Sequence, residues 1–303
     1  MRMTTRLRQS LAKGMVVAPG CFDAFSARLA ELAGFRAIHM TGLGVEATQL
    51  GAPDLGLLSM SEIVSHVSRM QAAISVPIIA DIDTGFGGVL NVQRTIREME
   101  RAGIGGVHIE DQSLPKHCPL LAGRKVVSRE EGLDRLKAAL DARTDADFVI
   151  AARTDADVIS FQELVDRANL YVEAGADLVM PVLMNIEGKS FFSFSSDQQM
   201  EWLTKLVSQI KGPVMSMGSG PPRGYVLDDL EKIGFSAVLF AAGPLGAAAN
   251  AMASYFASLK ETGNETAYID ANPGPYHDAL ALMRAAHLDR YVDIERRYTA
   301  SLE

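Results

Sequence analysis

Short apolar runs alternate along the chain with longer segments in which apolar residues recur every three or four positions. The runs are rich in Val, Ile, Leu and Met, as expected for strands covered on both faces, and the longer segments have the period of amphipathic helices. The predicted strands are residues 15–21, 37–41, 78–83, 106–110, 148–153, 178–182, 214–217 and 237–241. The predicted helices include residues 25–33, 61–73, 91–101, 129–142, 161–174 and 200–209. Eight such strand–helix units predict a closed (β/α)8 barrel of the TIM type rather than an open sheet.

The chain is predicted to form a single domain. No linker or low-complexity segment divides residues 1–303, and this length is usual for an α/β barrel. A helical extension is expected from about residue 245. Within it, residues 276–297 are predicted to form one helix, because Leu280, Met283 and Leu288 lie at near-helical spacing.

Composition and charge limit which binding partners and which cellular compartment are expected. The net charge of −8 argues against nucleic acid, which needs a basic surface, but not against an acidic substrate, whose binding depends on local cations. Cys21 and Cys118 are the only cysteines, so we expect no disulfide framework and a reducing compartment. The basic N-terminal segment lacks the apolar region of a signal peptide, and glycine and proline interrupt the apolar residues 237–252. We therefore expect a cytoplasmic protein with no membrane span.

The first candidate site follows the strand at residues 78–83. Asp81 and Asp83 are two residues apart, so in a continuing strand both side chains would project to the same side. Two adjacent carboxylates favour a cation between them. Oxygen ligands suit Mg²⁺, with Mn²⁺ as an alternative. The other interpretation is that the two aspartates cap the helix that follows the glycine-rich turn at residues 84–88.

Charged residues also end the next two predicted strands. Glu110 and Asp111 end a strand one βα unit after Asp81, and neighbouring parallel strands would bring the two acidic clusters together. Arg153 ends the strand at residues 148–153 in an apolar setting, where an unpaired guanidinium is costly. Its partner is either Asp155 or the carboxylate of a ligand.

Two further segments contain candidate functional residues. Lys116 and His117 precede Cys118 on a polar loop, a setting that lowers the pKa of a thiol; the alternative is an incidental cysteine, although cysteines are more often buried. After the second predicted strand, the glycine-rich turn at residues 40–44 can direct backbone N–H groups at an anion. The alternative for this segment is a simple tight turn.

Four motifs together resemble those of the isocitrate lyase/phosphoenolpyruvate mutase superfamily. They occupy residues 81–87, 108–112, 116–118 and 151–155, and they occur in the family's order at appropriate spacing, within a likeness that runs from about residue 16 to about residue 243. Within the superfamily the chain is most similar to the methylisocitrate lyase and 2,3-dimethylmalate lyase branch. The resemblance implies a Mg²⁺-dependent lyase that cleaves a carbon–carbon bond of a 2-hydroxy di- or tricarboxylic acid, releasing a 2-oxo acid and a carboxylic acid.

The resemblance also implies roles for individual residues. The implied metal ligands are Asp81, Asp83, Glu110 and, through water, Asp54. The implied substrate contacts are Thr41, Gly42, Leu43, Asp81, His108, Arg153 and Ser216. The implied catalytic group is Cys118, which would protonate the carbanion left by cleavage, with Lys116, His117 and Arg153 around it. A C-terminal helix swapped between subunits, and hence a homodimer or homotetramer, is a further expectation of the family.

The chain departs from the lyases of this family at three positions. Pro119 replaces a glycine in the loop that closes over the substrate, Val182 replaces a glutamate that contacts the substrate, and Ser216 replaces an asparagine. The segment at residues 184–199 is also longer than usual and carries three phenylalanines, which would make the pocket bulkier or more apolar. The alternative is a surface loop or a subunit-contact loop. The alternative functions are decarboxylation or hydrolysis of oxaloacetate, a phosphonate-type mutase, or a non-catalytic barrel that senses a carboxylate.

Overall fold

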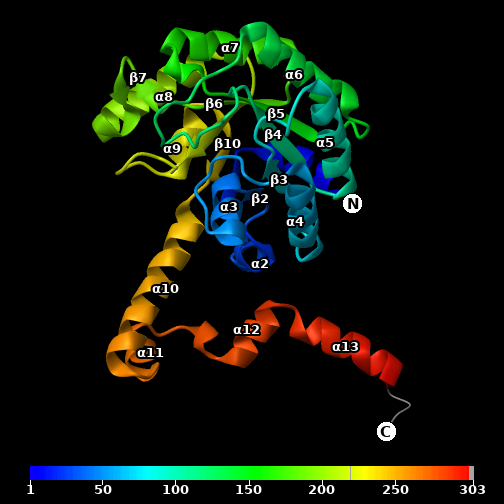
Figure 1. Cartoon of the computed structure of the whole chain (residues 1–303), viewed down its shortest axis with the longest axis vertical. Helices are drawn as coiled ribbons and strands as arrows, with labels where there is room; N and C mark the ends of the chain where they lie inside the picture. The colour runs from blue at the N-terminus through cyan, green and yellow to red at the C-terminus, as the bar shows by residue number, and fades with distance from the viewer. Residues whose placement is uncertain (219, 300–303) are drawn as a thin grey trace.

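The computed structural model describes residues 1–218 and 220–299, and at its centre eight parallel strands close into a barrel (Figure 1). The strands are β1 (Val16–Cys21), β2 (Ile38–Met40), β3 (Ile78–Asp81), β4 (Gly106–Glu110), β5 (Val149–Thr154), β6 (Leu178–Pro181), β9 (Val214–Gly218) and β10 (Phe235–Phe240). Each strand pairs with the next in this order, and β10 pairs with β1 to close the barrel. The predicted (β/α)8 fold is confirmed, and every predicted strand overlaps one that is present.

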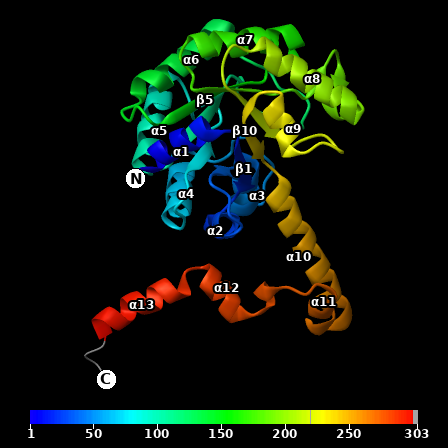
Figure 2. The same cartoon turned by 180° about the vertical axis from the view of Figure 1, so that it is seen from behind.

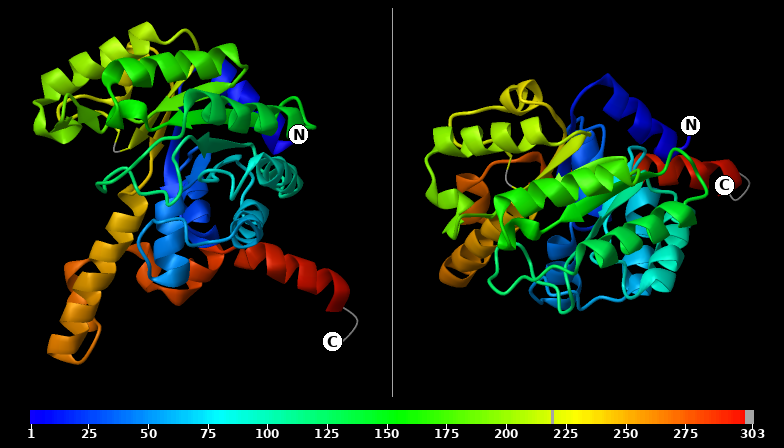
Figure 3. Two further views of the ribbon diagram at one scale, coloured as in Figure 1. Left: turned by 45° about the horizontal axis from the view of Figure 1, so that its top comes forward. Right: turned by 90° about the horizontal axis from the view of Figure 1, so that it is seen from above.

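Helices cover the outside of the barrel (Figure 3). They are α2 (Ala24–Leu32), α3 (Gly42–Leu50), α4 (Met60–Ala72), α5 (Val89–Arg101), α6 (Arg129–Ala142), α7 (Phe161–Glu173), α8 (Ser196–Gln209) and α9 (Leu227–Lys232). Several begin at a serine whose hydroxyl accepts the N–H of the residue three positions on, as Ser59 does for α4 and Ser160 for α7. Such capping fixes where each helix starts relative to the strand before it.

The N-terminal end of the barrel is covered by a helix that the sequence pattern did not predict. This helix is α1 (Met3–Lys13; Figure 2). Its Leu7 packs into the apolar cluster inside the barrel and has no exposed surface. The side chain of Arg8 also pairs with Asp177, which precedes β6. The opposite end of the barrel, where the strands finish, therefore carries the loops and the site.

A short hairpin extends the loop after β6. Its strands are β7 (Asn185–Ile186) and β8 (Lys189–Ser190), followed by a 3₁₀ turn at Phe191–Ser193. Asp157, in the 3₁₀ turn Ala156–Val158 after β5, accepts the N–H groups of Met184 and Asn185 at 2.8 Å each. The segment that the sequence marked as unusually long is thus anchored to the neighbouring strand's loop.

The C-terminal segment forms an arm that leaves the barrel (Figures 1 and 3). Its elements are α10 (Gly243–Thr262), α11 (Thr266–Ala271), a 3₁₀ turn (Pro275–His277), α12 (Ala279–Ala285) and α13 (Leu288–Thr299). Helices follow one another from Gly243 onward, and the single helix predicted at residues 276–297 is wrong. His287, with a φ of 67°, interrupts it between α12 and α13. None of the helices that the structure describes is both long and apolar enough to cross a bilayer.

Candidate functional site

A cavity of about 500 Å³ lies at the C-terminal end of the barrel strands. β2, β3, β4 and β5 contribute His39, Asp81, His108 and Arg153 to its wall, and Thr41 follows β2. Cys118 reaches the cavity from the loop after β4, and the start of α10 closes the opposite wall. The strand ends thus bring together polar residues that are far apart in the sequence, as the barrel fold requires.

The two aspartates after β3 do not share one orientation. The strand ends at Asp81, and Asp83 has a left-handed φ of 48°, so strand alternation does not continue and the predicted common side is wrong. Asp81 lines the 500 Å³ cavity, whereas Asp83 lines a neighbouring cavity of about 430 Å³. The N–H of Asp83 donates to Asp81 Oδ1 at 3.0 Å, which couples the two groups. Helix α5 begins after Gly88 with no side-chain cap, so capping does not explain these aspartates.

Lys116 joins two of the predicted metal ligands. Its Nζ lies 2.6 Å from Asp83 Oδ1 and also pairs with Asp54, and the lysine side chain is 4% exposed. Asp54 is held in place because Glu46 of α3 accepts the N–H groups of Leu55, Leu57 and Leu58. The two carboxylates therefore share one cation, the lysine ammonium.

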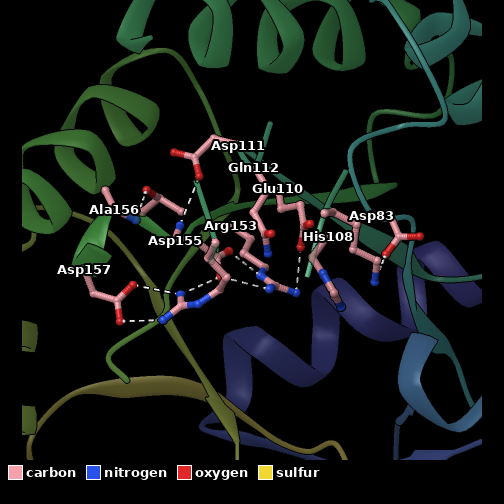
Figure 4. Close-up of polar contacts among 12 residues, drawn as sticks. Asp83, His108, Glu110, Asp111, Gln112, Arg153, Asp155, Ala156 and Asp157 are labelled. Carbon is pink, nitrogen blue, oxygen red and sulfur yellow. Dashed lines mark hydrogen bonds and ion pairs between the residues drawn. The ribbon is translucent and has the colours of Figure 1, made fainter. Parts of the chain in front are cut away.

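Arg153 bridges two buried carboxylates (Figure 4). Its Nη1 lies 2.8 Å from Glu110 Oε2, and its Nε and Nη2 donate to the oxygens of Asp155 at 2.8 and 3.1 Å. The sequence left open whether Asp155 or a ligand pairs with this arginine. The structure pairs Arg153 with Asp155 while leaving it in the cavity wall, so contact with a ligand stays a prediction.

Glu110 is the least satisfied acid of the cluster. Neither carboxylate oxygen accepts an aligned hydrogen bond, and burial raises the pKa of Glu110 well above its usual value despite Arg153. Asp111, its neighbour, instead serves the scaffold. It accepts the N–H of Asp155 at 3.0 Å (Figure 4). It also accepts the hydroxyl of Tyr171 at 3.0 Å. Asp111 is thus committed to the scaffold, whereas the charged partner of Glu110 is Arg153.

Hydrogen bonds and ion pairs fix both ends of the loop between β4 and α6. The side chain of Gln112 exchanges two hydrogen bonds with the backbone of His117, at 2.9 and 3.0 Å. The guanidinium of Arg124 donates a hydrogen bond to Asp155. It also makes a bidentate contact with Asp157, at 2.9 and 3.1 Å. Sequence reasoning missed Gln112 and Arg124 in these roles, and a lone loop arginine gives no signal of its partners.

Cys118 is buried in the cavity wall, at 8% exposed, and its N–H donates to the backbone oxygen of Asp54 at 3.3 Å. Burial raises the pKa of the Cys118 thiol, so the expectation that basic neighbours lower it is wrong. The physical reason is that burial outweighs the charges of Lys116 and Arg153, which lower the thiol pKa, while the charge of Asp54 raises it further. A thiol that stays protonated at neutral pH is suited to donating a proton.

Two histidines form a buried pair beside Asp81. His39 Nε2 and His108 Nε2 are 2.9 Å apart, and His108 Nδ1 lies 3.7 Å from Asp81 Oδ1. Burial lowers the pKa of His39 to about 3 and that of His108 to about 4, so both rings are neutral at pH 7. The place of His39 in the cavity wall was not predicted from the sequence.

The glycine-rich turn after β2 is the start of a helix. Thr41 caps α3, and its hydroxyl accepts the N–H of Gly44 at 3.5 Å. Thr41 and Leu43 line the cavity, while a Cβ added at Gly42 would lie 2.9 Å from Asp81 Oδ2. Gly42 is thus required for the close approach of Asp81. Ser216 lies in β9 and is not among the described cavity-lining residues, so its contact with substrate stays a prediction.

The acidic cluster fits a hard cation. Asp54 and Asp83 already hold a positive charge, and burial followed by the charge of Asp81 raises the pKa of Asp83 to about 6. Among the described residues, only His39, Asp81 and His108 bring one ligand atom each within 4.8 Å of one another, so the four predicted carboxylates do not converge as one tight set. Mg²⁺ tolerates this arrangement, because it usually binds one or two carboxylates and keeps several waters.

Comparison with known proteins places these features in a family. The model of the family described as phosphoenolpyruvate phosphomutase matches residues 7–260. The 2,3-dimethylmalate lyase of Eubacterium barkeri is 36% identical over 274 residues, which cover 89% of this chain and 90% of the relative. The 2-methylisocitrate lyase of Shewanella oneidensis is 35% identical over 269 residues and covers 88% of each chain.

A solved structure extends the likeness to the whole chain. Phosphonopyruvate hydrolase, in its complex with oxalate and Mg²⁺, has a TM-score of 0.83 and 28% sequence identity. The superposition covers 98% of this chain and 99% of the hydrolase. The chain is thus similar in sequence to proteins named as lyases and in structure to one named as a hydrolase.

Proposed function

The chain belongs to the phosphoenolpyruvate mutase/isocitrate lyase superfamily, and we propose that it is a Mg²⁺-dependent carbon–carbon lyase. Its substrate is a 2-hydroxy di- or tricarboxylic acid, and its products are a 2-oxo acid and a carboxylic acid. The observation that carries the proposal is one cavity whose wall contains two buried acids, Asp54 and Asp81, and the thiol of Cys118, whose pKa is raised by burial. The first group of residues suits a metal, and the second suits protonation of carbon.

The metal would be held by Asp81, Asp83 and Glu110, with Asp54 acting through water. Bound there, Mg²⁺ would lower the pKa of the substrate's 2-hydroxyl group and stabilise the forming 2-oxo acid. The neutral His39–His108 pair packs beside Asp81 and adds no positive charge to compete with a cation. His108 thus supports the orientation of Asp81.

The remaining residues bind the substrate and move its proton. The N-terminus of α3, at Gly42 and Leu43, directs backbone N–H groups toward a carboxylate, with the hydroxyl of Thr41 beside them. Arg153 lies in the same wall, where Glu110 and Asp155 fix its guanidinium. After cleavage, the thiol of Cys118 donates its proton to the carbanion carbon.

Removal of the metal is expected to abolish turnover. Chelation should stop release of 2-oxo acid from 2,3-dimethylmalate, and added Mg²⁺ should restore it. Asp81→Asn should lower kcat/KM by about 10³-fold, because it removes a charge from both the metal site and the substrate site. Asp111→Asn is the matched control for the assay, since Asp111 contacts the scaffold rather than the cavity. Turnover that survives chelation would contradict the proposal.

Lys116 is expected to compete with the metal for Asp54 and Asp83. Lys116→Met should therefore tighten Mg²⁺ binding, measured by calorimetry, by about tenfold, the equivalent of roughly 1.4 kcal/mol. Lys125→Met, on the exposed part of the same loop, should leave the Kd for Mg²⁺ unchanged. Equal or weaker Mg²⁺ binding by Lys116→Met would show that the lysine does not occupy the metal's place.

Self-association is part of the proposal. Helix α10 has no buried residue, and the arm exposes large apolar side chains that include Met252, Phe256, Leu280 and Met283. Such a surface favours contact with another copy of the chain. We expect a homodimer or homotetramer in which the arm packs on a neighbouring subunit.

A second candidate function is decarboxylation or hydrolysis of oxaloacetate. Val182 is 1% exposed and offers no carboxylate at the position where the family's lyases place a glutamate. The same metal and arginine would serve a 2-oxo acid without that glutamate. Oxaloacetate therefore belongs in every substrate panel.

A further inference from the structure

The two halves of the cavity differ in chemistry, and the barrel order explains why. The polar residues His39, Asp81, His108 and Arg153 come from β2 to β5, which are consecutive around the barrel. The wall on the side of β6, β9 and β10 is apolar. It is formed by Met184, Phe192, Phe240, Ala241 and Ala247, together with Pro119 and Leu120 from the loop after β4. A bound substrate therefore meets charges along one wall and hydrocarbon along the other.

Among the residues that the structure describes, no free positive charge faces the apolar half. Arg153 is the one Lys or Arg among the described residues that line the cavity, and Glu110 and Asp155 already occupy its guanidinium. Asn250, on α10, is uncharged. A carboxylate placed against this wall would lose water without gaining an ionic partner, which is strongly unfavourable.

The residues of the apolar wall are fixed by specific contacts. Phe191 is buried, its N–H donates to the oxygen of Met184 at 2.9 Å, and its ring packs edge-on against Phe192 with centroids 5.7 Å apart. The N–H of Met184 in turn donates a hydrogen bond to the carboxylate of Asp157. Phe192, by contrast, is 49% exposed, so its ring is available to cover an apolar group in the cavity.

We propose that the substrate is a malate that carries an apolar alkyl group longer than methyl on C3. This inference rests on the proposed lyase function and specifies its substrate class. The hydroxy-carboxylate end faces Asp81 and Arg153, and the alkyl group lies against Met184, Phe192 and Phe240. The C2–C3 bond breaks with its electron pair on C3, the 2-hydroxyl loses its proton, and C3 gains one proton. The products are a 2-oxo acid and a saturated carboxylic acid that carries the alkyl chain, and no further reactant is needed.

The test compares kcat/KM for 2-methylmalates that bear methyl, ethyl, propyl and butyl groups on C3, with methylisocitrate alongside. Each added methylene should raise kcat/KM by about fourfold, the effect of burying one CH₂ group. Methylisocitrate, whose C3 substituent ends in a carboxylate, should fall below the methyl compound. A decline with chain length, or a preference for methylisocitrate, would overturn the inference while leaving the lyase in place. If no hydroxy acid is cleaved, the lyase proposal itself fails.

Two phenylalanine variants test where the alkyl group of the substrate lies. Phe192→Ala should reduce the preference for butyl over methyl by about tenfold, while cleavage of the methyl compound shows that the protein is folded and active. Phe35→Ala is the matched control, because Phe35 is also partly exposed, at 36%, but precedes β2 at the other end of the barrel. An unchanged butyl-to-methyl ratio in Phe192→Ala would show that the alkyl group does not lie against this wall.

Discussion

Cys118→Ser is expected to lower turnover of the hydroxy acid by about 10²–10⁴-fold, the usual contribution of a positioned general acid. The thiol lies in the cavity wall, and burial keeps its pKa raised, so it carries a proton at neutral pH. A serine hydroxyl has nearly the same shape but is a far weaker acid. The loss should therefore appear in kcat, with the Kd for Mg²⁺ unchanged in calorimetry.

The other cysteine provides the control. Cys21, at the end of β1, is 1% exposed and is not among the described residues that line the cavity. Cys21→Ala should keep turnover within about threefold, since it removes a small core group and no reacting one. Near-normal turnover of Cys118→Ser would end the assignment of this thiol as the acid.

Arg153→Met is expected to destabilise the fold by about 3–5 kcal/mol, because it leaves Glu110 and Asp155 buried without their cation. The arginine side chain is 4% exposed and contacts both acids. Arg124 still pairs with Asp155, so the lower part of that range is expected. Urea unfolding, followed by circular dichroism, measures the change.

An exposed arginine offers a matched comparison. Arg129 also bridges two acids, Glu163 and Asp166, but its side chain is 43% exposed. Arg129→Met should cost no more than about 1 kcal/mol, as usual for surface ion pairs. If both variants unfold at the same urea concentration, the ion-pair network around Arg153 does not hold the barrel end together.

The barrel could be predicted because each apolar run is short, rich in branched residues and followed by an amphipathic segment. Once the runs at residues 78–83 and 106–110 are consecutive parallel strands, Asp81 and Glu110 must end at the same edge of the barrel. The resemblance to the superfamily rested on these same residues, and the family match over residues 7–260 confirms it. The roles given to individual site residues, the oligomeric state and the cytoplasmic location stay predictions.

The local errors have physical causes. Strand alternation misplaced Asp83, because the backbone turns left-handed there. The position of Lys116 next to Cys118 in the sequence suggested that the lysine lowers the pKa of the thiol. In the fold, the ammonium of Lys116 instead pairs with Asp54 and Asp83, which lie on other segments of the chain. The interruption at His287 has no signature in a pattern of apolar spacing. Each error concerns a backbone conformation or a long-range pairing that sequence periodicity does not encode.

The decisive measurement is product analysis of 2,3-dimethylmalate cleavage with Mg²⁺ in D₂O, run beside oxaloacetate and repeated with Cys118→Ser. We expect equal amounts of pyruvate and propionate, with one deuteron on C2 of the propionate, and loss of this reaction in the variant. That outcome would establish carbon–carbon cleavage followed by protonation of the carbanion. Consumption of oxaloacetate alone, at the same rate with and without the Cys118 thiol, would contradict the lyase and make this protein a decarboxylase or hydrolase.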